Sequence, residues 1–249
     1  MPVTFSQAIE VFARGFAFTR SYTHPYLAEQ VEEGVWALRD AERKRGNYRS
    51  EEYAGHGISP ERFDAIARKH TRGNFRLCAI RTTEESDEEL RREFKAMNYR
   101  LVTTEAFMVQ DLKRIPKAPA PVKIERVTTV EQVQTLAKAA GKRQILPEFL
   151  EMQPEPMRQY IALDEGQPIG WVGSVVTTGC AWCTNMYVAP EYRRRGIARA
   201  LMTRMLQDDR RAGAQANVLF ASHAGAKLYP LVGYRLIGEL LMFMPQRSK

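Results

Sequence analysis

Cysteines and long apolar runs are scarce in this sequence of 249 residues. Three cysteines, a small and odd number, are typical of a protein kept in a reducing compartment. No uninterrupted apolar run approaches the roughly 18–20 residues of a membrane span, and the N-terminus lacks the basic-then-apolar pattern of a signal peptide. We therefore expect a cytoplasmic protein without a membrane partner.

Metal-binding and redox motifs are also poorly represented. Cys180 and Cys183 form a Cys-x-x-Cys, but no second pair of cysteines or histidines lies at ligand spacing, and the histidines are scattered. In a strand, residues three apart point to opposite faces, which suits neither a disulfide nor a shared metal ion. The two cysteines are interpreted as structural, and no metal is expected.

Acidic residues are sparse in the second half of the chain. The net charge is +8, and residues 121–249 carry 17 basic and 11 acidic side chains, against 20 and 18 in residues 1–120. A basic half suits a polyanionic ligand or an acidic macromolecule. Because the basic residues are not interleaved with aromatic ones as in recognisable nucleic-acid modules, no nucleic-acid partner is expected.

The most informative segment is residues 189–202, which follows an apolar, strand-like run from Cys180 to Val188. Apolar residues after Ala198 recur with the helical period, so the pattern predicts a strand, a short basic loop and a helix. The first turn of a helix has unpaired N–H groups and a positive dipole end. Gly196 allows a phosphate to approach the backbone, and Arg193 to Arg195 add permanent charge. The segment predicts a site for a phosphorylated ligand, and its spacing fits neither a P-loop nor a dinucleotide fingerprint.

The spacing of these residues resembles that of a known family. Arg193-x-x-Gly196-x-Ala198 is similar to the acetyl-CoA pyrophosphate signature of the GNAT acetyltransferases. Further along, Tyr229 follows a leucine and precedes Gly233-Tyr234, which resembles the second signature of that family. The resemblance extends over residues 122–249. It implies an N-acetyltransferase that moves an acyl group from acetyl-CoA to a primary amine by direct attack in a ternary complex.

The resemblance also implies roles for individual residues. Tyr229 matches the tyrosine that protonates the departing CoA sulfur, and a core tyrosine is the alternative. Backbone groups of Met186 and Val188 would pair with the pantetheine arm, and an N–H near Met186 or Tyr187 would polarise the thioester carbonyl. Ser222 stands where many relatives carry an asparagine that contacts CoA. The residues expected to bind acetyl-CoA are thus Met186, Tyr187, Val188, Arg193, Arg194, Arg195, Gly196, Ile197, Ala198 and Ser222.

The sequence does not identify a general base. Many relatives carry a glutamate on the fourth strand, but no acid lies between Ala181 and Tyr187. A water relay is one option. The missing acid favours an alternative function, a non-catalytic acyl-CoA-binding sensor or interaction module, whereas Tyr229 favours the enzyme. The acceptor amine is not identified, and a homodimer is left open. The candidate bases are Glu148, Glu151, Glu155 and His223.

A proline-rich connector at residues 113–121 indicates the domain organisation. It separates an N-terminal α/β domain, residues 1–112, from a GNAT domain, residues 122–249. In the GNAT domain, Thr128 with Glu131 is predicted to cap a helix that ends near Ala140, and a helical stretch is predicted from His223 to Val232, closed by Gly233. Strands are predicted at Val122 to Arg126, Met157 to Leu163, Pro168 to Val176, Cys180 to Val188 and Asn217 to Ser222.

The first half contains a trace of an internal repeat. Tyr99-Arg-Leu repeats Tyr234-Arg-Leu at the same place in a helix-to-strand pattern, with Phe94 in place of Tyr229. Around residues 58–63, where the pyrophosphate loop would lie, the signature is missing. We interpret residues 1–112 as a degenerate GNAT-like copy that lost catalysis, with an unrelated α/β domain as the alternative. The predicted fold class is α/β: a GNAT-type mixed sheet flanked by helices, with a second, degenerate GNAT-like domain.

Overall fold

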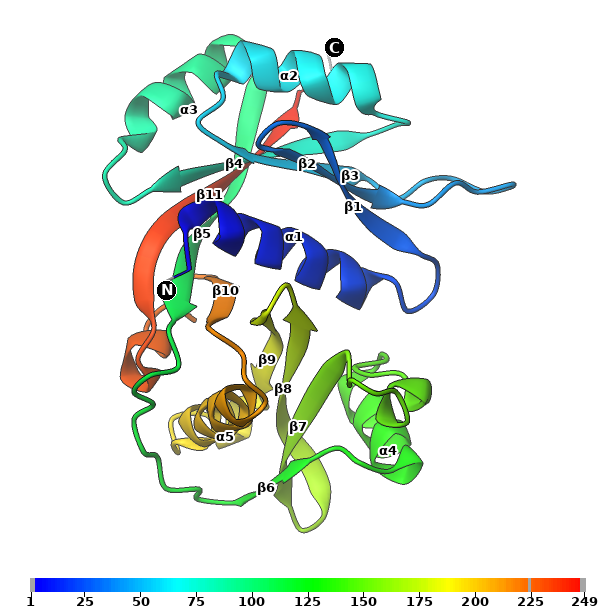
Figure 1. The fold of residues 1–249 in the computed structure, drawn as a ribbon, viewed down its shortest axis with the longest axis vertical. Coiled ribbons are helices and arrows are strands. Elements are labelled where there is room, and N and C mark those ends of the chain that lie inside the picture. Colours follow the sequence, from blue (N-terminus) through cyan, green and yellow to red (C-terminus); the bar gives the residue numbers. More distant parts are fainter. Residues whose placement is uncertain (1–2, 224, 247–249) are drawn as a thin grey trace. The chain divides into compact units, whose positions relative to one another are not determined.

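The computed structural model describes residues 3–223 and 225–246, and the chain forms two compact units (Figure 1). The N-terminal unit is built mainly from Phe5–Met108, together with Phe220–Ala226 and the segment from residue 236 onward. The C-terminal unit is built mainly from Val109–Leu219 and Lys227–Arg235. The units differ from the predicted ranges 1–112 and 122–249 because the last strand of the chain pairs with a strand of the first half.

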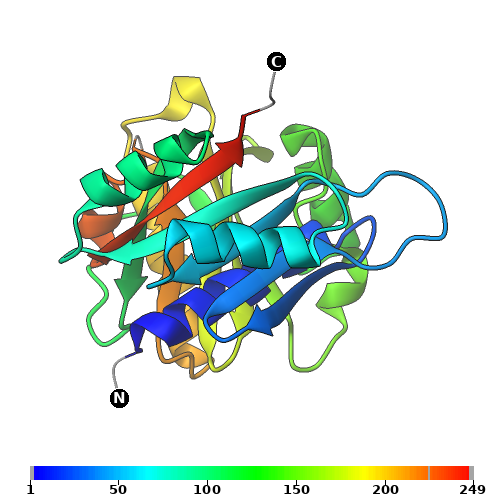
Figure 2. The ribbon, with the colours of Figure 1, turned by 90° about the horizontal axis from the view of Figure 1, so that it is seen from above.

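The N-terminal unit is a mixed sheet between two helical layers. Its strands lie in the order β1-β2-β3-β4-β11-β5. Helices α2 and α3 cover one face of this sheet and α1 covers the other (Figures 1 and 2). The strands are β1 Tyr26–Glu32, β2 Val35–Asp40, β3 Glu51–His56, β4 Phe75–Thr82, β5 Tyr99–Gln110 and β11 Arg235–Pro245; the helices are α1 Phe5–Arg20, α2 Pro60–His70 and α3 Asp87–Ala96.

The C-terminal unit carries the strand meander that the sequence predicts. Strands β6 to β9 pair antiparallel in sequence order, and β10 pairs parallel with β9. Both hairpin turns, Glu165-Gly166 and Thr178-Gly179, have positive φ at both residues, the conformation that suits two-residue hairpins. Helices α4 and α5 lie on opposite sides of β7 and β8 in Figure 1. The elements are β6 Lys123–Arg126, α4 Val130–Ala140, β7 Met157–Asp164, β8 Gln167–Thr177, β9 Cys180–Val188, α5 Ile197–Arg211 and β10 Asn217–Ala221.

Two local predictions for the C-terminal unit are wrong. The cap of α4 is Thr129, not Thr128, because the Gln132 side chain reaches back to the N-cap backbone and completes the capping box in place of Glu131. The helix predicted from His223 to Val232 is replaced in the described residues by turns and a short 3₁₀ helix, η3 Tyr229–Val232. Pro230 removes a backbone donor there and disfavours helix before it. Residue 224 lies outside the described residues.

The internal repeat is visible in the packing of each unit. Phe94 and Tyr99 meet edge to face, with ring centroids 5.6 Å apart and planes at 70°. Tyr229 and Tyr234 meet in the same way, at 5.5 Å and 66°. The residue before each second tyrosine, Tyr99 or Tyr234, has a positive φ, 61° in one unit and 88° in the other. Tyr99 is the first residue of β5 and Tyr234 directly precedes β11, so the three-residue match in the sequence marks a structural repeat.

The described helices are all too short or too polar to cross a membrane. Their lengths follow from local signals at their ends. Ser59 caps α2, whose first residue is Pro60, and Ser86 caps α3, whose first turn is acidic. Because capped amphipathic helices bury one face against a sheet, each unit has its own core.

Candidate functional site

Strand β9 changes character halfway along its length. Its first four residues are buried, whereas Thr184 to Val188 are half-buried or exposed. Among the described residues, β10 pairs with β9 only at Ala181 and Trp182. In the N-terminal unit, by contrast, β3 and β4 pair in parallel along the whole of β3. The second half of β9 therefore has backbone groups that no parallel neighbour occupies.

A β-bulge lies in this open half of β9. Against β8, Gly173 pairs with Thr184 and Trp171 pairs with Tyr187, so β9 has one residue more than β8 in this interval. Asn185 takes up the extra residue with a φ of 52°. A bulge takes backbone groups out of the regular ladder and redirects them. An extended ligand arm can pair with backbone groups here.

Three residues predicted to bind the ligand, Met186, Tyr187 and Val188, follow the bulge. Met186 and Val188 are half-buried, and the exposed Tyr187 ring stacks on Trp171 with centroids 4.4 Å apart. A Cβ at Gly170 would lie 2.9 Å from the Tyr187 carbonyl oxygen, so only glycine permits this close pairing of β8 and β9. The sheet thus holds the end of β9 in a fixed position.

The loop after β9 opens α5 with an anion-binding geometry. Arg193 Nε donates a hydrogen bond to the Val188 carbonyl oxygen at 3.0 Å, which fixes the start of the loop. Arg194 and Gly196 have φ of 64° and 85°, and Gly196 is the N-cap of α5 without a side-chain cap. Ala200 N–H is bonded to the Gly196 carbonyl at 3.0 Å. The N–H groups of the first helical residues, before Ala200, have no acceptor within the helix and form the positive end of its dipole.

The surroundings of this loop leave room for a phosphate group. A Cβ added at Gly196 would meet no atom within 4 Å. Arg193, Arg194 and Arg195 are all exposed, and the Arg195 guanidinium lies 5.3 Å from the centre of the Tyr192 ring. Tyr192 in turn donates a hydrogen bond to Asp164 at 2.8 Å. The loop therefore presents exposed cationic groups around an open helix N-terminus, which fits a diphosphate.

Tyr229 is a buried tyrosine with a free hydroxyl. It is 7% exposed, and its hydroxyl makes no hydrogen bond to any described residue. Burial raises the pKa of Tyr229 well above its usual range, and the nearby Cys183 thiol adds to this effect. The phenol consequently stays protonated at neutral pH, as a proton donor must.

A buried polar network lies behind Tyr229, and the sequence analysis missed it. Tyr234, which packs on Tyr229, donates a hydrogen bond to Asn217 at 2.5 Å, and Asn217 donates to Asp209 at 2.7 Å. Burial raises the pKa of the fully buried Asp209, and the hydrogen bond from Ser174 (2.7 Å) opposes this shift. The sequence does contain a signal for this network: Asp209 is an acid on the apolar face of α5, one turn after Met205.

Other predicted residues lie apart from this group. Ser222 belongs to the segment that packs with the N-terminal unit, where its hydroxyl accepts a hydrogen bond from Gly225 N–H at 3.3 Å. His223 bonds Thr104 in the same unit, at 3.0 Å. Among the proposed bases, Glu148 and Glu151 are exposed and Glu155 is paired with Arg126. Within residues 3–223 and 225–246, no three histidine, cysteine or acidic side chains gather as metal ligands would.

The equivalent loop of the N-terminal unit has a capped helix start and acidic neighbours, in contrast to the open, basic loop before α5. There β3 leads into α2 through Gly57 and Ser59, but Ser59 caps the helix and Pro60 has no N–H to offer. A cavity of about 230 Å³ at this place includes Glu85, Glu89 and Glu93 in its lining. Three carboxylates repel a polyphosphate, so this copy of the loop does not fit CoA.

Comparison with known proteins agrees with this geometry. The family model of the acetyltransferase (GNAT) domain matches residues 156–236, which include β7 to β10, the Gly196 loop and Tyr229. No curated protein sequence matches the chain. Residues 156–236 form an acetyltransferase domain of the GNAT family, a class of acyltransferases.

Solved structures extend the likeness of fold to almost the whole chain. A GCN5-related N-acetyltransferase from Kribbella flavida is 16% identical, with a TM-score of 0.66 over 97% of this chain and 96% of its own. One from Sphaerobacter thermophilus is 20% identical, with a TM-score of 0.55 over 87% of this chain and 79% of its own. A tandem GNAT protein from the clavulanic acid biosynthesis pathway is 14% identical, with a TM-score of 0.54 over 100% of this chain and 98% of its own. At these identities the likeness shows the fold, which is the predicted GNAT-type α/β fold with a second GNAT-like domain.

Proposed function

We propose that the C-terminal unit is an acetyl-CoA-dependent N-acetyltransferase that acts on a primary amine. The observation that carries this proposal is the left-handed Gly196 at the start of α5, surrounded by exposed arginines, in a GNAT domain. The N–H groups of Ile197 and Ala198 would bind the diphosphate of CoA, and Arg193 to Arg195 would neutralise its charge. Backbone groups of Met186 and Val188 would hold the pantetheine arm along the open half of β9.

The chemistry follows from these placements. A neutral amine attacks the thioester carbonyl carbon, and the N–H near Met186 or Tyr187 stabilises the oxyanion that forms. As the carbonyl re-forms, the carbon–sulfur bond breaks and the Tyr229 hydroxyl gives its proton to the sulfur. The attacking nitrogen gives one proton to water, and water returns a proton to the Tyr229 phenolate, so the reaction balances. The products are an amide and CoA.

The missing acid on β9 supports a second candidate. Residues Ala181 to Tyr187 contain no carboxylate that would take the proton of the amine. A chain that binds acyl-CoA without transferring the acyl group would act as a sensor or interaction module. The hydroxyl of Tyr229 supports the enzyme, because it makes no hydrogen bond to the described residues and so can donate its proton to the leaving sulfur.

Thiol release by the full-length chain separates the two candidates. The chain is incubated with acetyl-CoA and a panel of amino acids, polyamines, aminoglycosides and peptides, and free CoA is followed with a thiol reagent. Cys78, Cys180 and Cys183 are all buried, which keeps the background from the protein low. Release that depends on an amine is expected. Calorimetric binding of acetyl-CoA without release on any amine would favour the sensor, and absence of binding would overturn both proposals.

A further inference from the structure

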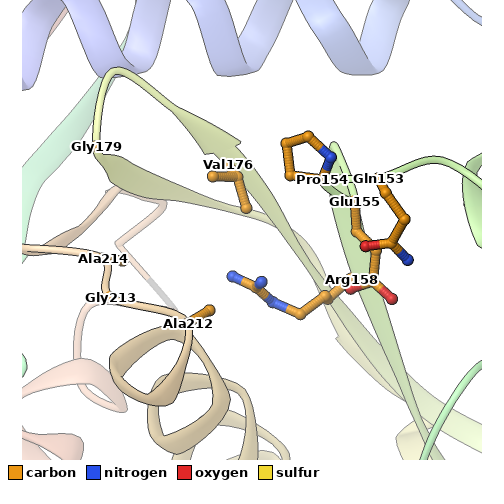
Figure 3. Close-up of a pocket in the computed structure, with 9 residues that line it drawn as sticks. All are labelled: Gln153, Pro154, Glu155, Arg158, Val176, Gly179, Ala212, Gly213 and Ala214. Atoms are coloured by element: carbon orange, nitrogen blue, oxygen red, sulfur yellow. The ribbon is translucent and has the colours of Figure 1, made fainter.

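A second pocket lies at the opposite end of α5 from Gly196. It has a volume of about 270 Å³ and is formed by the end of β8, the turn after it and the residues after α5 (Figure 3). Helix α5 has 15 residues, so at about 1.5 Å per residue the pocket is about 20 Å from the diphosphate loop. Its lining residues are Gln153, Pro154, Glu155, Arg158, Val176, Gly179, Ala212, Gly213 and Ala214. The pocket is therefore separate from the proposed CoA site.

The polar feature of this pocket is the buried Arg158. The Arg158 residue is only 6% exposed, and its guanidinium extends between Val176 and Ala212 in Figure 3. Its Nη2 donates to Asp209 at 2.9 Å, the only hydrogen bond that this side chain makes to the described residues. Nε is buried and has no partner at all among them. A buried N–H without an acceptor is costly, and a guanidinium binds a carboxylate through two parallel hydrogen bonds.

Neighbouring residues cannot supply the missing acceptor. The Asp209 carboxylate already accepts hydrogen bonds from Ser174 at 2.7 Å and from Asn217 at 2.7 Å, besides the one from Arg158. Glu155, the other acid in the lining, is paired with Arg126. The unpaired donors of Arg158 thus point to an acceptor that comes from outside the chain.

The surroundings select the kind of acceptor. Pro154, Val176, Ala212 and Ala214 are apolar, and the volume of about 270 Å³ fits a short aliphatic body. The carbonyl end of α5 and the Glu155 carboxylate disfavour a second negative charge. We propose that this pocket binds a small aliphatic monocarboxylate, with its carboxylate on Arg158 and its chain against Val176 and Ala212.

Butyrate serves as the probe, with butyramide as its neutral counterpart and inorganic phosphate as the dianion. Binding to the full-length chain is followed by titration in ligand-observed NMR. For a ligand of this size we expect a Kd of about 1 mM for butyrate, with no saturable binding of butyramide. Saturation by butyramide, or tighter binding of phosphate than of butyrate, would overturn the monocarboxylate assignment.

Two substitutions at Val176 test the location. Val176 is 37% exposed, so either a charged or a neutral polar side chain is tolerated there without unfolding. Val176→Glu places a negative charge at the pocket mouth and should raise the Kd of butyrate at least about tenfold, whereas Val176→Gln, of the same size, should change it less than about twofold. Acetyl-CoA affinity should be the same in both variants. Equal butyrate affinity in the two folded variants would place the ligand elsewhere. If Val176→Glu does not fold, Ala212→Glu and Ala212→Gln make the same comparison at the exposed Ala212.

Discussion

At the scale of single residues, the proposed mechanism depends on a tyrosine hydroxyl that holds its proton. Tyr229→Phe removes one hydroxyl and keeps the ring against Tyr234, so acetyl-CoA affinity and thermal stability should change little. General acid catalysis contributes about 10²–10⁴-fold, and kcat should fall by that order. Thiol release and thermal unfolding of the same preparation measure the two effects. Unchanged kcat would remove Tyr229 from the mechanism.

Tyr234→Phe is the matched control for that variant. It removes a hydroxyl that donates a hydrogen bond to Asn217 at 2.5 Å. The loss leaves a buried acceptor unpaired, which costs about 1–3 kcal/mol of stability. We expect a lower melting temperature with kcat reduced far less than in Tyr229→Phe. If both variants lose kcat equally, the hydroxyl of Tyr229 has no special role.

The residues of the proposed CoA loop could be predicted because they are close in the sequence. Their spacing and the family resemblance predicted a basic loop at a helix start, and in the structure Gly196 is the N-cap of α5 without a side-chain cap, with Ala198 in the first turn. The pairing of Arg158 with Asp209 could not be predicted. The three side chains that donate hydrogen bonds to Asp209 come from three different strands, and Asp209 itself lies near the end of α5. A buried pair of this kind depends on tertiary packing that no local pattern encodes.

At the scale of elements, the two ends of α5 provide an internal comparison. Gly196 and Gly213 have φ of 85° and 83°, and a Cβ at either would meet no atom within 4 Å. Valine at either position has the same backbone strain. Gly196→Val should lower acetyl-CoA affinity at least tenfold, or about 1.4 kcal/mol, while Gly213→Val should leave it unchanged. Calorimetry on both variants makes the comparison, and equal affinities would place the diphosphate away from Gly196.

The degenerate loop between β3 and α2 gives a third comparison. Gly57 has a φ of 69° and open space around it, like Gly196, but the adjoining cavity holds three glutamates. Gly57→Val should therefore keep full acetyl-CoA affinity, and one molecule of acetyl-CoA should bind per chain. The same calorimetric titration gives the affinity and the stoichiometry. A stoichiometry of two, reduced to one by Gly57→Val, would show that the first copy still binds the ligand.

Elements were predicted well where a run of apolar residues marks them, and poorly where their limits depend on which residue caps or breaks a helix. The strand from Cys180 to Val188 has the predicted limits because a short, mostly apolar run is a strong strand pattern. The stretch from His223 to Val232 has helical spacing, but Pro230 limits it to a 3₁₀ turn. The cap of α4 shifted by one residue because glutamine completes a capping box as well as glutamate does.

At the scale of the whole molecule, buried tyrosines make stability depend on alkaline pH. Burial is the first cause that raises the pKa of Tyr26, Tyr53, Tyr99, Tyr160 and Tyr229. The unfolded chain loses these protons at a pKa of about 10, whereas the folded chain keeps them to higher pH. Stability from these groups is therefore fully present below about pH 10 and falls as the pH rises further. Urea unfolding between about pH 9 and about pH 11 should show this fall; a constant free energy of unfolding would contradict it.

The fold class could be predicted from the order of elements, but the partner of the last strand could not. Alternating residues in β11 specify which face is buried and leave open which strand lies alongside. The structure pairs β11 with β4, from Gly238–Thr82 to Phe243–Leu77. Because two similar copies are present in one chain, the strand that follows Tyr234 has a choice of sheets, and local patterns do not distinguish them.

This pairing changes what a fragment of the protein should do. Leu241 and Phe243 of β11 are fully buried in the core of the N-terminal unit, and Phe243 stacks on Phe94 with centroids 4.0 Å apart. A fragment of residues 121–249 loses β4 and Phe94, so β11 would present an unpaired edge and two exposed core side chains. We expect the fragment to aggregate or to associate through β11, while the full chain unfolds cooperatively. Size-exclusion chromatography and thermal unfolding of both test this, with Leu241→Lys in the fragment as the variant that should restore solubility. A monomeric fragment that melts cooperatively without this substitution would show that residues 121–249 fold without the first half.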